Sequence, residues 1–235
     1  TSLDENIVDF VIPNNEEVLY GVQQQSSYVG KRYSLRTGEI TTLFTIPFRE
    51  AVISWGGSSD ATHYAYPKAT KQLEGFVYKI SGASLERLPI TGYGLSAIGA
   101  GDTVLFSHMI TTRTTQDYIS QYHIAGSGVS NVPISIIPEK CTTTTLAKFI
   151  CAAPTNLQTN SMLPDSWYQG KTITADYLWE VTPSLGSVKS ILNLTAESGR
   201  ELDVVNITTN TFSTKLYFQD RHSKFLWLYE LTTAE

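Results

Sequence analysis

Three aspartates that stand in or beside predicted strands are the residues of this sequence best suited to catalysis. Asp9, Asp102 and Asp203 could supply the carboxylates of a glycoside hydrolase, in which one protonates the leaving oxygen and another activates water or attacks the sugar. The sequence contains no Gly-x-Ser-x-Gly nucleophile elbow and no calcium-loop motif. Because acids at strand ends are commonly turn formers, we predict that the chain is not an enzyme and has no catalytic residue.

A second group of residues has the composition of a binding site. The segment Pro164–Gly170 places two large aromatic side chains beside polar groups, as expected where a carbohydrate or a protein is contacted. We predict binding by Asp165, Trp167, Tyr168 and Gln169. In the structural alternative, Trp167 and Tyr168 fold back as a lid over a neighbouring unit of the fold, bury apolar area and only hold the loop in place.

The two cysteines, Cys141 and Cys151, flank a Thr-rich segment at a spacing that suits the two arms of one β-hairpin. They could form a disulfide, which would imply an oxidising, extracytoplasmic setting, or remain two buried thiols. No further Cys or His stands at zinc-finger spacing. The sequence therefore predicts no metal site and no cofactor.

An internal repeat of about 44 residues predicts the elements that position these groups. One strand of each repeat carries an apolar marker, and the next is centred on an aromatic residue. In four repeats a glycine suited to a hairpin turn follows. The first-strand markers are Tyr20, Tyr64, Phe106, Ile150 and Tyr217, and the hairpin glycines are Gly38, Gly82, Gly126 and Gly186.

Four strands in a repeat of this length are typical of β-propeller blades. The low content of charged residues, 17%, also favours strands over helices. We predict an all-β chain, a single β-propeller domain over 1–235 with about five recognisable four-stranded blades, the last lacking its outer strand. The rival fold is a two-sheet β-sandwich. The predicted blades span about 3–50, 51–94, 95–140, 141–200 and 201–235.

The innermost strand of each blade is expected to come first in its repeat. Gly92–Ala97 imitates a dinucleotide-binding fingerprint, but we interpret it as the turn between the second and third blades. The predicted innermost strands are Ile7–Ile12, Ala51–Trp55, Leu95–Ala100, Cys141–Leu146 and Leu202–Thr208.

The fourth repeat is longer than the others, which indicates an insertion at 154–176. Insertions into a blade form loops on one rim of a propeller, where binding residues are often found. The insertion contains all four predicted binding residues. It is therefore the segment in which we expect a partner to bind.

The charge of the chain limits its partners. The net charge is −5 and the isoelectric point about 5.4, and the 17 basic residues are scattered, so no nucleic-acid partner is expected. No apolar run approaches the roughly 20 residues that cross a bilayer. Because the sequence begins at Thr1, we expect membrane attachment only through an upstream anchor outside this chain, and ring closure either by upstream sequence or not at all.

Several segments together resemble a known group of proteins. Glu139–Cys141, Phe149–Pro154, Pro164–Gly170 and Leu178-Trp179 are similar to segments of uncharacterised WD40-like, TolB-like β-propeller proteins of candidate-phyla (Patescibacteria-type) bacteria. The resemblance covers most of the chain and is most specific from about residue 139 onward. It implies the propeller fold, pairing of Cys141 with Cys151, the inserted loop and a membrane anchor ahead of the propeller. It implies no activity.

The sequence as a whole thus predicts a non-enzymatic extracytoplasmic propeller, located at the cell surface or anchored to a membrane. It would serve as a protein- or glycan-binding or structural module. Two alternatives stay open. The first is a glycosidase-like enzyme with its carboxylates at the central channel. The second is the propeller portion of a larger surface appendage or secretion assembly.

Overall fold

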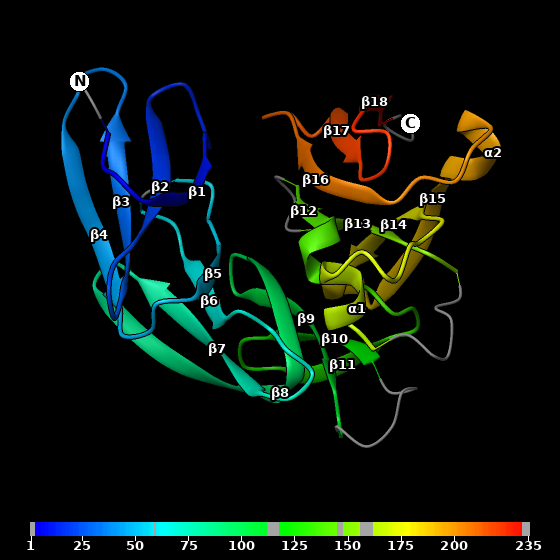
Figure 1. Cartoon of the computed structure of the whole chain (residues 1–235), viewed down its shortest axis with the longest axis horizontal. Coiled ribbons are helices and arrows are strands. Elements are labelled where there is room, and N and C mark those ends of the chain that lie inside the picture. The colour runs from blue at the N-terminus through cyan, green and yellow to red at the C-terminus, as the bar shows by residue number, and fades with distance from the viewer. Residues whose placement is uncertain (1–2, 59, 112–117, 145–147, 156–161, 232–235) are drawn as a thin grey trace. The chain divides into compact units, whose positions relative to one another are not determined.

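The computed structural model describes residues 3–58, 60–111, 118–144, 148–155 and 162–231 (Figure 1). Within these ranges the chain forms 18 β-strands, two short α-helices and two short 3-10 helices. The prediction of an all-β chain is confirmed, as expected for a sequence rich in β-branched and aromatic residues. The chain divides into a first unit, Thr1–Lys68 with Gly75–Thr91, and a second unit, Ala69–Glu74 with Gly92–Glu235.

The first unit contains one complete antiparallel sheet in the order β1-β2-β3-β4. Its other strands are β5, β6, β7 and the first part of β8, which are neighbours in that order. The core between these strands contains Tyr28, Phe44, Ile53 and Ile80. The strands are β1 (Ile7–Val11), β2 (Glu17–Gln23), β3 (Tyr28–Ser34), β4 (Ile40–Ile46), β5 (Ala51–Ser54), β6 (His63–Pro67), β7 (Glu74–Ser81) and β8 (Ser84–Ala100).

The long strand β8 corrects one prediction. The segment Gly92–Ala97 lies inside β8, so the interpretation as a turn between blades is wrong, and two predicted blades share one strand. The register with β9 shifts between Tyr93 and Ser96, where Gly94 has φ +60°, a backbone conformation that favours glycine. The glycines therefore allow a bulge, which bends a strand without ending it.

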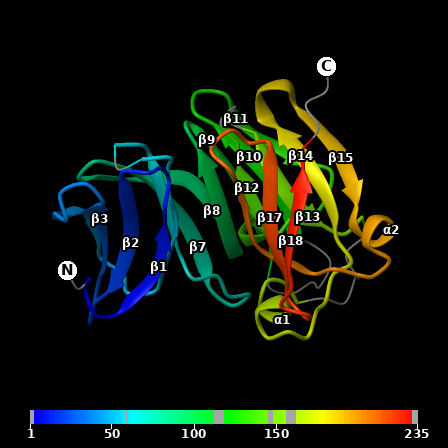
Figure 2. The same cartoon turned by 90° about the horizontal axis from the view of Figure 1, so that it is seen from above.

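The second unit contains three antiparallel sheets (Figure 2). The end of β8 pairs with β9, and β10 and β11 complete that sheet. The next sheet has the order β12-β13-β14-β15, and the last contains only β16-β17-β18 among the described residues. The strands are β9 (Thr103–Met109), β10 (Tyr118–Ile124), β11 (Gly128–Val132), β12 (Cys141–Thr143), β13 (Phe149–Ala153), β14 (Tyr177–Thr182), β15 (Ser187–Asn193), β16 (Val204–Thr209), β17 (Lys215–Asp220) and β18 (Leu226–Glu230).

The four-stranded sheets fit the four-stranded blades of a propeller. The predicted innermost strands coincide with β1, β5, the end of β8, β12 and β16, although residues 145–147 lie outside the described part of the chain. The four predicted hairpin glycines all have positive φ, between 55° and 80°. The described strands form separate sheets and do not close into one continuous sheet.

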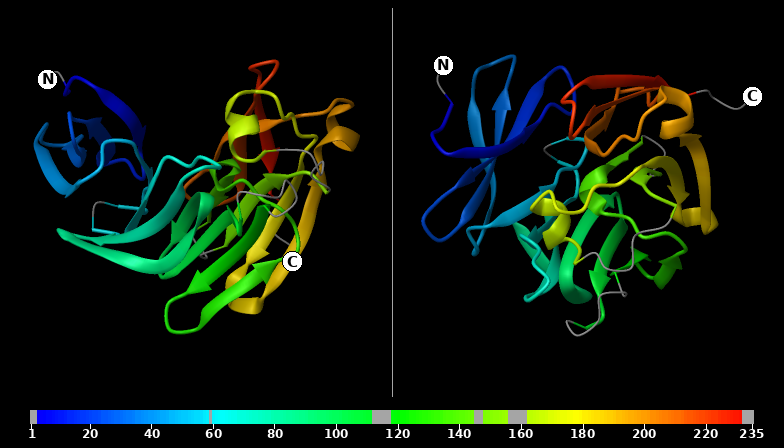
Figure 3. Two further views of the ribbon diagram at one scale, coloured as in Figure 1. Left: turned by 60° about the horizontal axis from the view of Figure 1, so that its bottom comes forward. Right: turned by 45° about the vertical axis from the view of Figure 1, so that its right-hand side comes forward.

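Strand β13 is an inner strand of the sheet β12-β13-β14-β15, whose ribbon is coloured from green to yellow in Figure 3. Phe149 and Cys151 contribute to one hydrophobic cluster, whereas Ile150 and Ala152 contribute to another. Successive side chains of a strand point to opposite faces, so both faces of this sheet are covered. That is why the sequence of β13 is continuously apolar rather than alternating.

Candidate functional site

The inserted loop packs onto its own unit through a short helix, α1 (Asp165–Tyr168). Trp167 is only 7% exposed and belongs to a cluster with Met109, Tyr118 and Ile137. The arrangement matches the structural alternative, in which the aromatic side chains hold the loop against the fold. Residues 156–161 of the insertion lie outside the described residues.

The other predicted binding residues of the loop are held to different degrees. The backbone N–H of Lys71 donates to Asp165 Oδ2 at 2.5 Å, and the Tyr168 hydroxyl donates to Glu139 Oε1. Burial, together with the nearby Glu139 carboxylate, raises the pKa of Tyr168, so the hydroxyl remains a donor. Gln169 is exposed. Partner binding by these residues stays a prediction, with Gln169 the most accessible of the four.

Beneath α1 lies a buried ion cluster centred on Lys140. Its Nζ donates to Asp176 Oδ2 at 2.6 Å and to Asp203 Oδ1 at 2.7 Å. The third donor hydrogen of the ammonium group is taken by Thr174 Oγ1. The side chains of Lys140, Asp176 and Asp203 are at most 1% exposed. Burying one cation and two carboxyl groups carries a large desolvation cost, which only close pairing can offset.

The two aspartates of the cluster have different surroundings. Asp203 Oδ1 accepts from Thr174 Oγ1 at 2.9 Å and from Trp167 Nε1 at 3.3 Å as well as from Lys140. Asp176 Oδ2 accepts one further bond, from the backbone N–H of Val204 at 2.8 Å. Burial raises the pKa of Asp176, although Lys140 opposes this. The second oxygens, Asp176 Oδ1 and Asp203 Oδ2, are buried and lack a hydrogen-bond partner among the described residues.

Sheet topology explains why these three residues meet. Lys140, Asp176 and Asp203 directly precede β12, β14 and β16, respectively. Because β12 and β14 each pair antiparallel with β13, they run in the same direction and begin at the same end of the sheet. A backbone hydrogen bond of 3.0 Å from Asp176 N–H to the Leu202 carbonyl brings the start of β16 to the same end of this sheet.

Sequence reasoning missed this cluster. Asp203 was considered only as a possible catalytic acid, and neither Lys140 nor Asp176 was singled out. The signal available was that each of the three charged residues stands immediately before a strand. Adjacent to Lys140, Cys141 pairs with Cys151 in a disulfide, as the resemblance implied.

Two of the three candidate carboxylates of a glycoside hydrolase, Asp9 and Asp203, are held by different hydrogen-bond donors. Asp9 lies in β1 of the first unit and accepts bonds from the Tyr28 hydroxyl, at 2.5 Å, and from Trp55 Nε1, at 3.2 Å. Burial raises the pKa of Asp9. Asp203 is part of the ion cluster of the second unit, and Asp102 lies in the turn between β8 and β9. The structure does not bring Asp9 and Asp203 together within one unit.

Neither a metal-holding cluster nor a membrane-spanning helix occurs in the described part of the chain. The described residues contain no group of three or more His, Cys, Asp and Glu side chains arranged to hold a metal ion. None of the helices they form is long and apolar enough to span a membrane.

Comparison with known proteins identifies the fold. No family model matches the chain, and no curated protein sequence matches it significantly. Among solved structures, TolB from Acinetobacter baumannii superposes with a TM-score of 0.60 at 12% identity, over 95% of this chain and 51% of that chain. The β-propeller domain of the Trilobed protease from Pyrococcus furiosus, described as having an open velcro topology, has a TM-score of 0.56 at 9% identity over 97% of this chain and 72% of its own. The fold is that of a TolB-like β-propeller.

A third similar structure is the nidogen/laminin complex, with a TM-score of 0.53 at 12% identity over 96% of this chain and 76% of that chain. Identities this low show the fold alone. The chain spans about half the length of the TolB chain that it matches, at 51%.

Proposed function

We propose that this chain is a non-enzymatic, extracytoplasmic β-propeller module that binds an extended segment of a protein partner along the outer edge of β18. The observation that carries the proposal is the three-stranded sheet β16-β17-β18. In the described part of the second unit, the strands that correspond to β18 are β10 and β14, which pair on their outer side with β11 and β15, respectively. No strand pairs with the outer edge of β18. The similarity to a structure of a protein complex supports the same class of function.

The backbone of β18 presents hydrogen-bonding groups along this edge. The Phe225 carbonyl accepts from Asp220 N–H and the Leu231 N–H donates to the Thr214 carbonyl, so these groups face β17. Because strand residues alternate in direction, the N–H and C=O groups of Leu226, Leu228 and Glu230 face outward. A row of such groups is a template for a further strand.

The side chains of β18 differ from those of the other edge strands of this unit. Leu226 is 75% and Leu228 53% exposed, and Phe225 just before them is 59% exposed. By contrast, β11 exposes Ser130 and Asn131 beside a single apolar residue, Val129, and β15 exposes Lys189 and Ser190. Polar or charged residues usually protect sheet edges from pairing. We therefore infer that the occupant of the β18 edge is a strand with apolar side chains at alternate positions.

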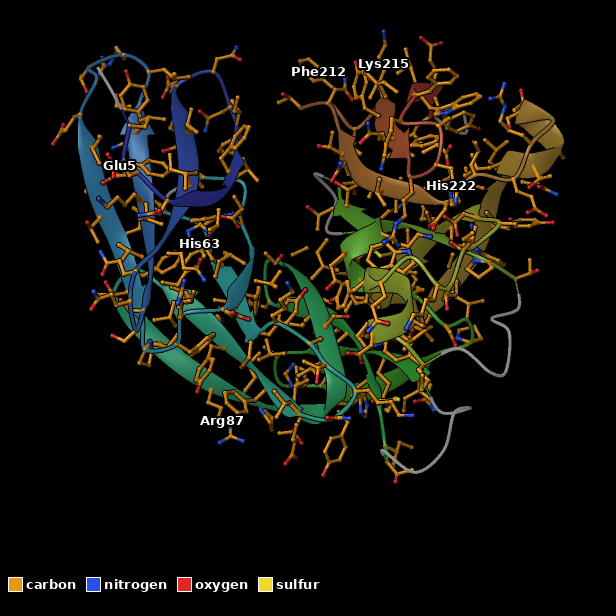
Figure 4. The ribbon with its side chains drawn as sticks, in the orientation of Figure 1. Glu5, His63, Arg87, Phe212, Lys215 and His222 are labelled. Atoms are coloured by element: carbon orange, nitrogen blue, oxygen red, sulfur yellow. A yellow bond between two sulfur atoms is a disulfide. The ribbon has the colours of Figure 1, made fainter. Side chains whose placement is uncertain are left out.

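A further exposed aromatic residue lies in the same sheet. Phe212, in the turn between β16 and β17, is 81% exposed, and Figure 4 shows its side chain directed away from the ribbon of its unit. Exposed apolar side chains of this size mark interaction sites more often when they are grouped than when they are single. We assign Phe212 to the partner surface of the three-stranded sheet.

The disulfide and the TolB-like fold support an extracytoplasmic location, because disulfides persist in oxidising compartments. A cell-surface position, a membrane anchor upstream of Thr1 and an origin in candidate-phyla bacteria belong to the same proposal. Protease treatment of intact producing cells tests the location. Cleavage of the protein without lysis is expected, and full protection until lysis would contradict an outward-facing position.

A phage-displayed library of random linear peptides tests the proposed edge. Peptides with alternating apolar residues should be enriched on the immobilised protein. The variant Leu226→Lys/Leu228→Lys should weaken their binding at least about tenfold, because charges on an edge oppose strand addition. Leu185→Lys is the matched control, because Leu185 is 78% exposed in the same unit. No enrichment, or equal binding by both variants, would overturn the proposal. Dimerisation that Leu226→Lys/Leu228→Lys abolishes would identify a second copy as the occupant instead.

The absence of enzymatic activity is tested with a panel of glycoside substrates. The wild-type protein should release no sugar above the background of the buffer. Release that is lost in Asp9→Asn, Asp102→Asn or Asp203→Asn would instead support the glycosidase alternative, because glycoside hydrolysis needs paired carboxyl groups.

Glycan binding by the inserted loop is a second hypothesis, favoured by the exposure of Gln169 beside Tyr168. A glycan array would compare the wild-type protein with Gln169→Ala, which removes an exposed side chain without disturbing the cluster around Trp167. A glycan bound by the wild type and lost in Gln169→Ala would support the loop as a site. Membership of a larger surface assembly is compatible with the β18 edge, since such assemblies can join subunits by strand addition.

A further inference from the structure

The Lys140 cluster has the geometry of a site for covalent cross-linking, independent of the binding function proposed above. Lys140 Nζ lies 2.6 Å from Asp176 Oδ2 and 2.7 Å from Asp203 Oδ1, and all three side chains are at most 1% exposed. We propose that Lys140 and Asp176 condense spontaneously to an intramolecular isopeptide bond, with Asp203 as the group that transfers the protons.

The hydrogen bonds assign the roles of the two aspartates. Asp203 Oδ1 accepts from Lys140, Thr174 and Trp167, so the oxygen that would take the proton from Lys140 is already in hydrogen-bond contact with it. Asp176 has one backbone donor besides Lys140, and its Oδ1 is buried without a partner among the described residues. Burial favours the neutral acid at Asp176. A neutral carboxylic acid is the form that an amine attacks, so Asp176 is the electrophile and Asp203 the base.

The reaction balances without any further reactant. Asp203 takes a proton from the Lys140 ammonium group, and the neutral Nζ attacks Cγ of protonated Asp176. An N–C bond forms, and a C–O bond of Asp176 breaks. The attacking nitrogen loses a second proton, and the departing hydroxyl takes up a proton through Asp203 and leaves as water. The products are one amide bond and one water molecule, and Asp203 ends protonated, because the ammonium group and Asp176 together bring four hydrogens, of which the amide keeps one and water takes two.

The surroundings favour the amide over the ion pair. Holding a nucleophile against its electrophile can correspond to effective concentrations of about 10⁵ M or more. The indole of Trp167 lies over Lys140, with the Nζ atom 5.8 Å from the ring centroid, and helps to exclude solvent that would hydrolyse the product. Condensation also removes a buried cation and a buried acid, whose desolvation is costly.

The cross-link would add a second covalent tie at the start of β12. The disulfide already joins Cys141 of β12 to Cys151 of β13. A bond from Lys140 to Asp176 would tie the residue before β12 to the residue before β14, and would close the insertion into a covalent ring. The sheet that carries the loop would then be fastened across three consecutive strands.

The mass of the purified full chain tests the proposal after reduction and unfolding. We expect a mass lower than that of the produced sequence by one water molecule. Trypsin should fail to cleave after Lys140, and a branched peptide should join Lys140 to the tryptic segment 172–189, which contains Asp176. The full sequence mass with normal cleavage after Lys140 would overturn the proposal, as would a loss of water that maps to a residue outside the pair.

Three variants separate the cross-link from a buried ion pair. Asp176→Asn keeps an electrophile but changes its leaving group, so the expected loss becomes one ammonia molecule. Lys140→Arg and Asp203→Asn should each show the full sequence mass, the first because it lacks the amine and the second because it lacks the base. Far-ultraviolet circular dichroism and the intact disulfide show that each variant is folded. A cross-link that still forms in folded Asp203→Asn would overturn the role of Asp203.

Discussion

Two aspartates at the first strands of their sheets have the same kinds of donor but different charges nearby. Asp9, in β1, accepts from the Trp55 indole N–H at 3.2 Å and from the Tyr28 hydroxyl. Asp203, directly before β16, accepts from the Trp167 indole N–H at 3.3 Å and from the Thr174 hydroxyl. Only Asp203 also contacts a buried cation, Lys140.

The difference shows that hydrogen-bond donors alone do not decide the charge of a buried acid. Neutral donors leave the pKa of Asp9 raised by burial, so Asp9 has an increased tendency to be protonated. A lysine within 2.7 Å makes Asp203 part of an ion cluster. Gly21 permits the neutral arrangement, because a Cβ atom there would collide with the Tyr28 hydroxyl and with Asp9.

Removing the buried cation should have the largest effect. Lys140→Met leaves Asp176 and Asp203 buried without the lysine that pairs with both and also removes the proposed amide, and we expect the free energy of unfolding to fall by at least about 3–5 kcal/mol. Lys31→Met, which removes the partly exposed partner of Asp4 in the first unit, should cost about 1 kcal/mol or less. Urea denaturation of both variants measures the difference, and equal losses would contradict a special role for burial.

Loss of the disulfide beside Lys140 should have the next largest effect. Cys141→Ala/Cys151→Ala opens the loop that the disulfide closes between two residues ten positions apart, and should lower the free energy of unfolding by about 2–3 kcal/mol. The reason is the greater conformational freedom of the unfolded chain. Wild-type protein measured with reductant is the matched comparison, and it should lose a similar amount. A loss confined to the variant would point to a packing defect rather than the bond.

The two indole donors should differ in strength because only one of their acceptors pairs with a lysine. Trp167→Phe removes a bond to Asp203, which also pairs with Lys140, and should cost about 1.5–3 kcal/mol, whereas Trp55→Phe removes a bond to Asp9, whose donors are neutral, and should cost about 0.5–1.5 kcal/mol. Thermal unfolding of the two variants ranks them. The reverse order would mean that the lysine beside Asp203 does not strengthen its bond to the indole.

The smallest effect on stability is expected from Asp9→Asn at low pH. As the pH rises, the stability of the variant relative to the wild type should increase. The folded pKa of Asp9 lies above its ordinary value of 3.8, so the stabilisation from its protonated form is complete below about pH 3.8 and is lost as the pH rises through the folded pKa. The amide of the variant does not titrate. Stability measured from pH 3 to 7 should therefore decline less steeply in Asp9→Asn, and parallel curves would contradict the raised pKa.

Local patterns identified most of the strands. The marker residues Tyr20, Tyr64 and Phe106 stand in β2, β6 and β9, because a half-buried strand selects aromatic and aliphatic side chains whatever lies beyond it. The hairpin glycines were predictable for a similar reason, since a tight turn requires positive φ within a few residues. The continuation of β8 through Gly92–Ala97 was not predictable, because a bulge and a turn both select glycine.

The sequence by itself determined an all-β chain, its repeat, the spacing that lets Cys141 meet Cys151, and the place of the insertion. These properties depend on short-range patterns and on periodicity. Only the tertiary structure decided that Trp167 is buried, and that Lys140, Asp176 and Asp203 share one site. The three charged residues are far apart along the chain. Lys140 and Asp176 meet because β12 and β14 begin at the same end of one sheet, and a backbone bond from Asp176 to Leu202 brings Asp203 to them. That pairing is set by long-range contacts, which a local pattern does not encode.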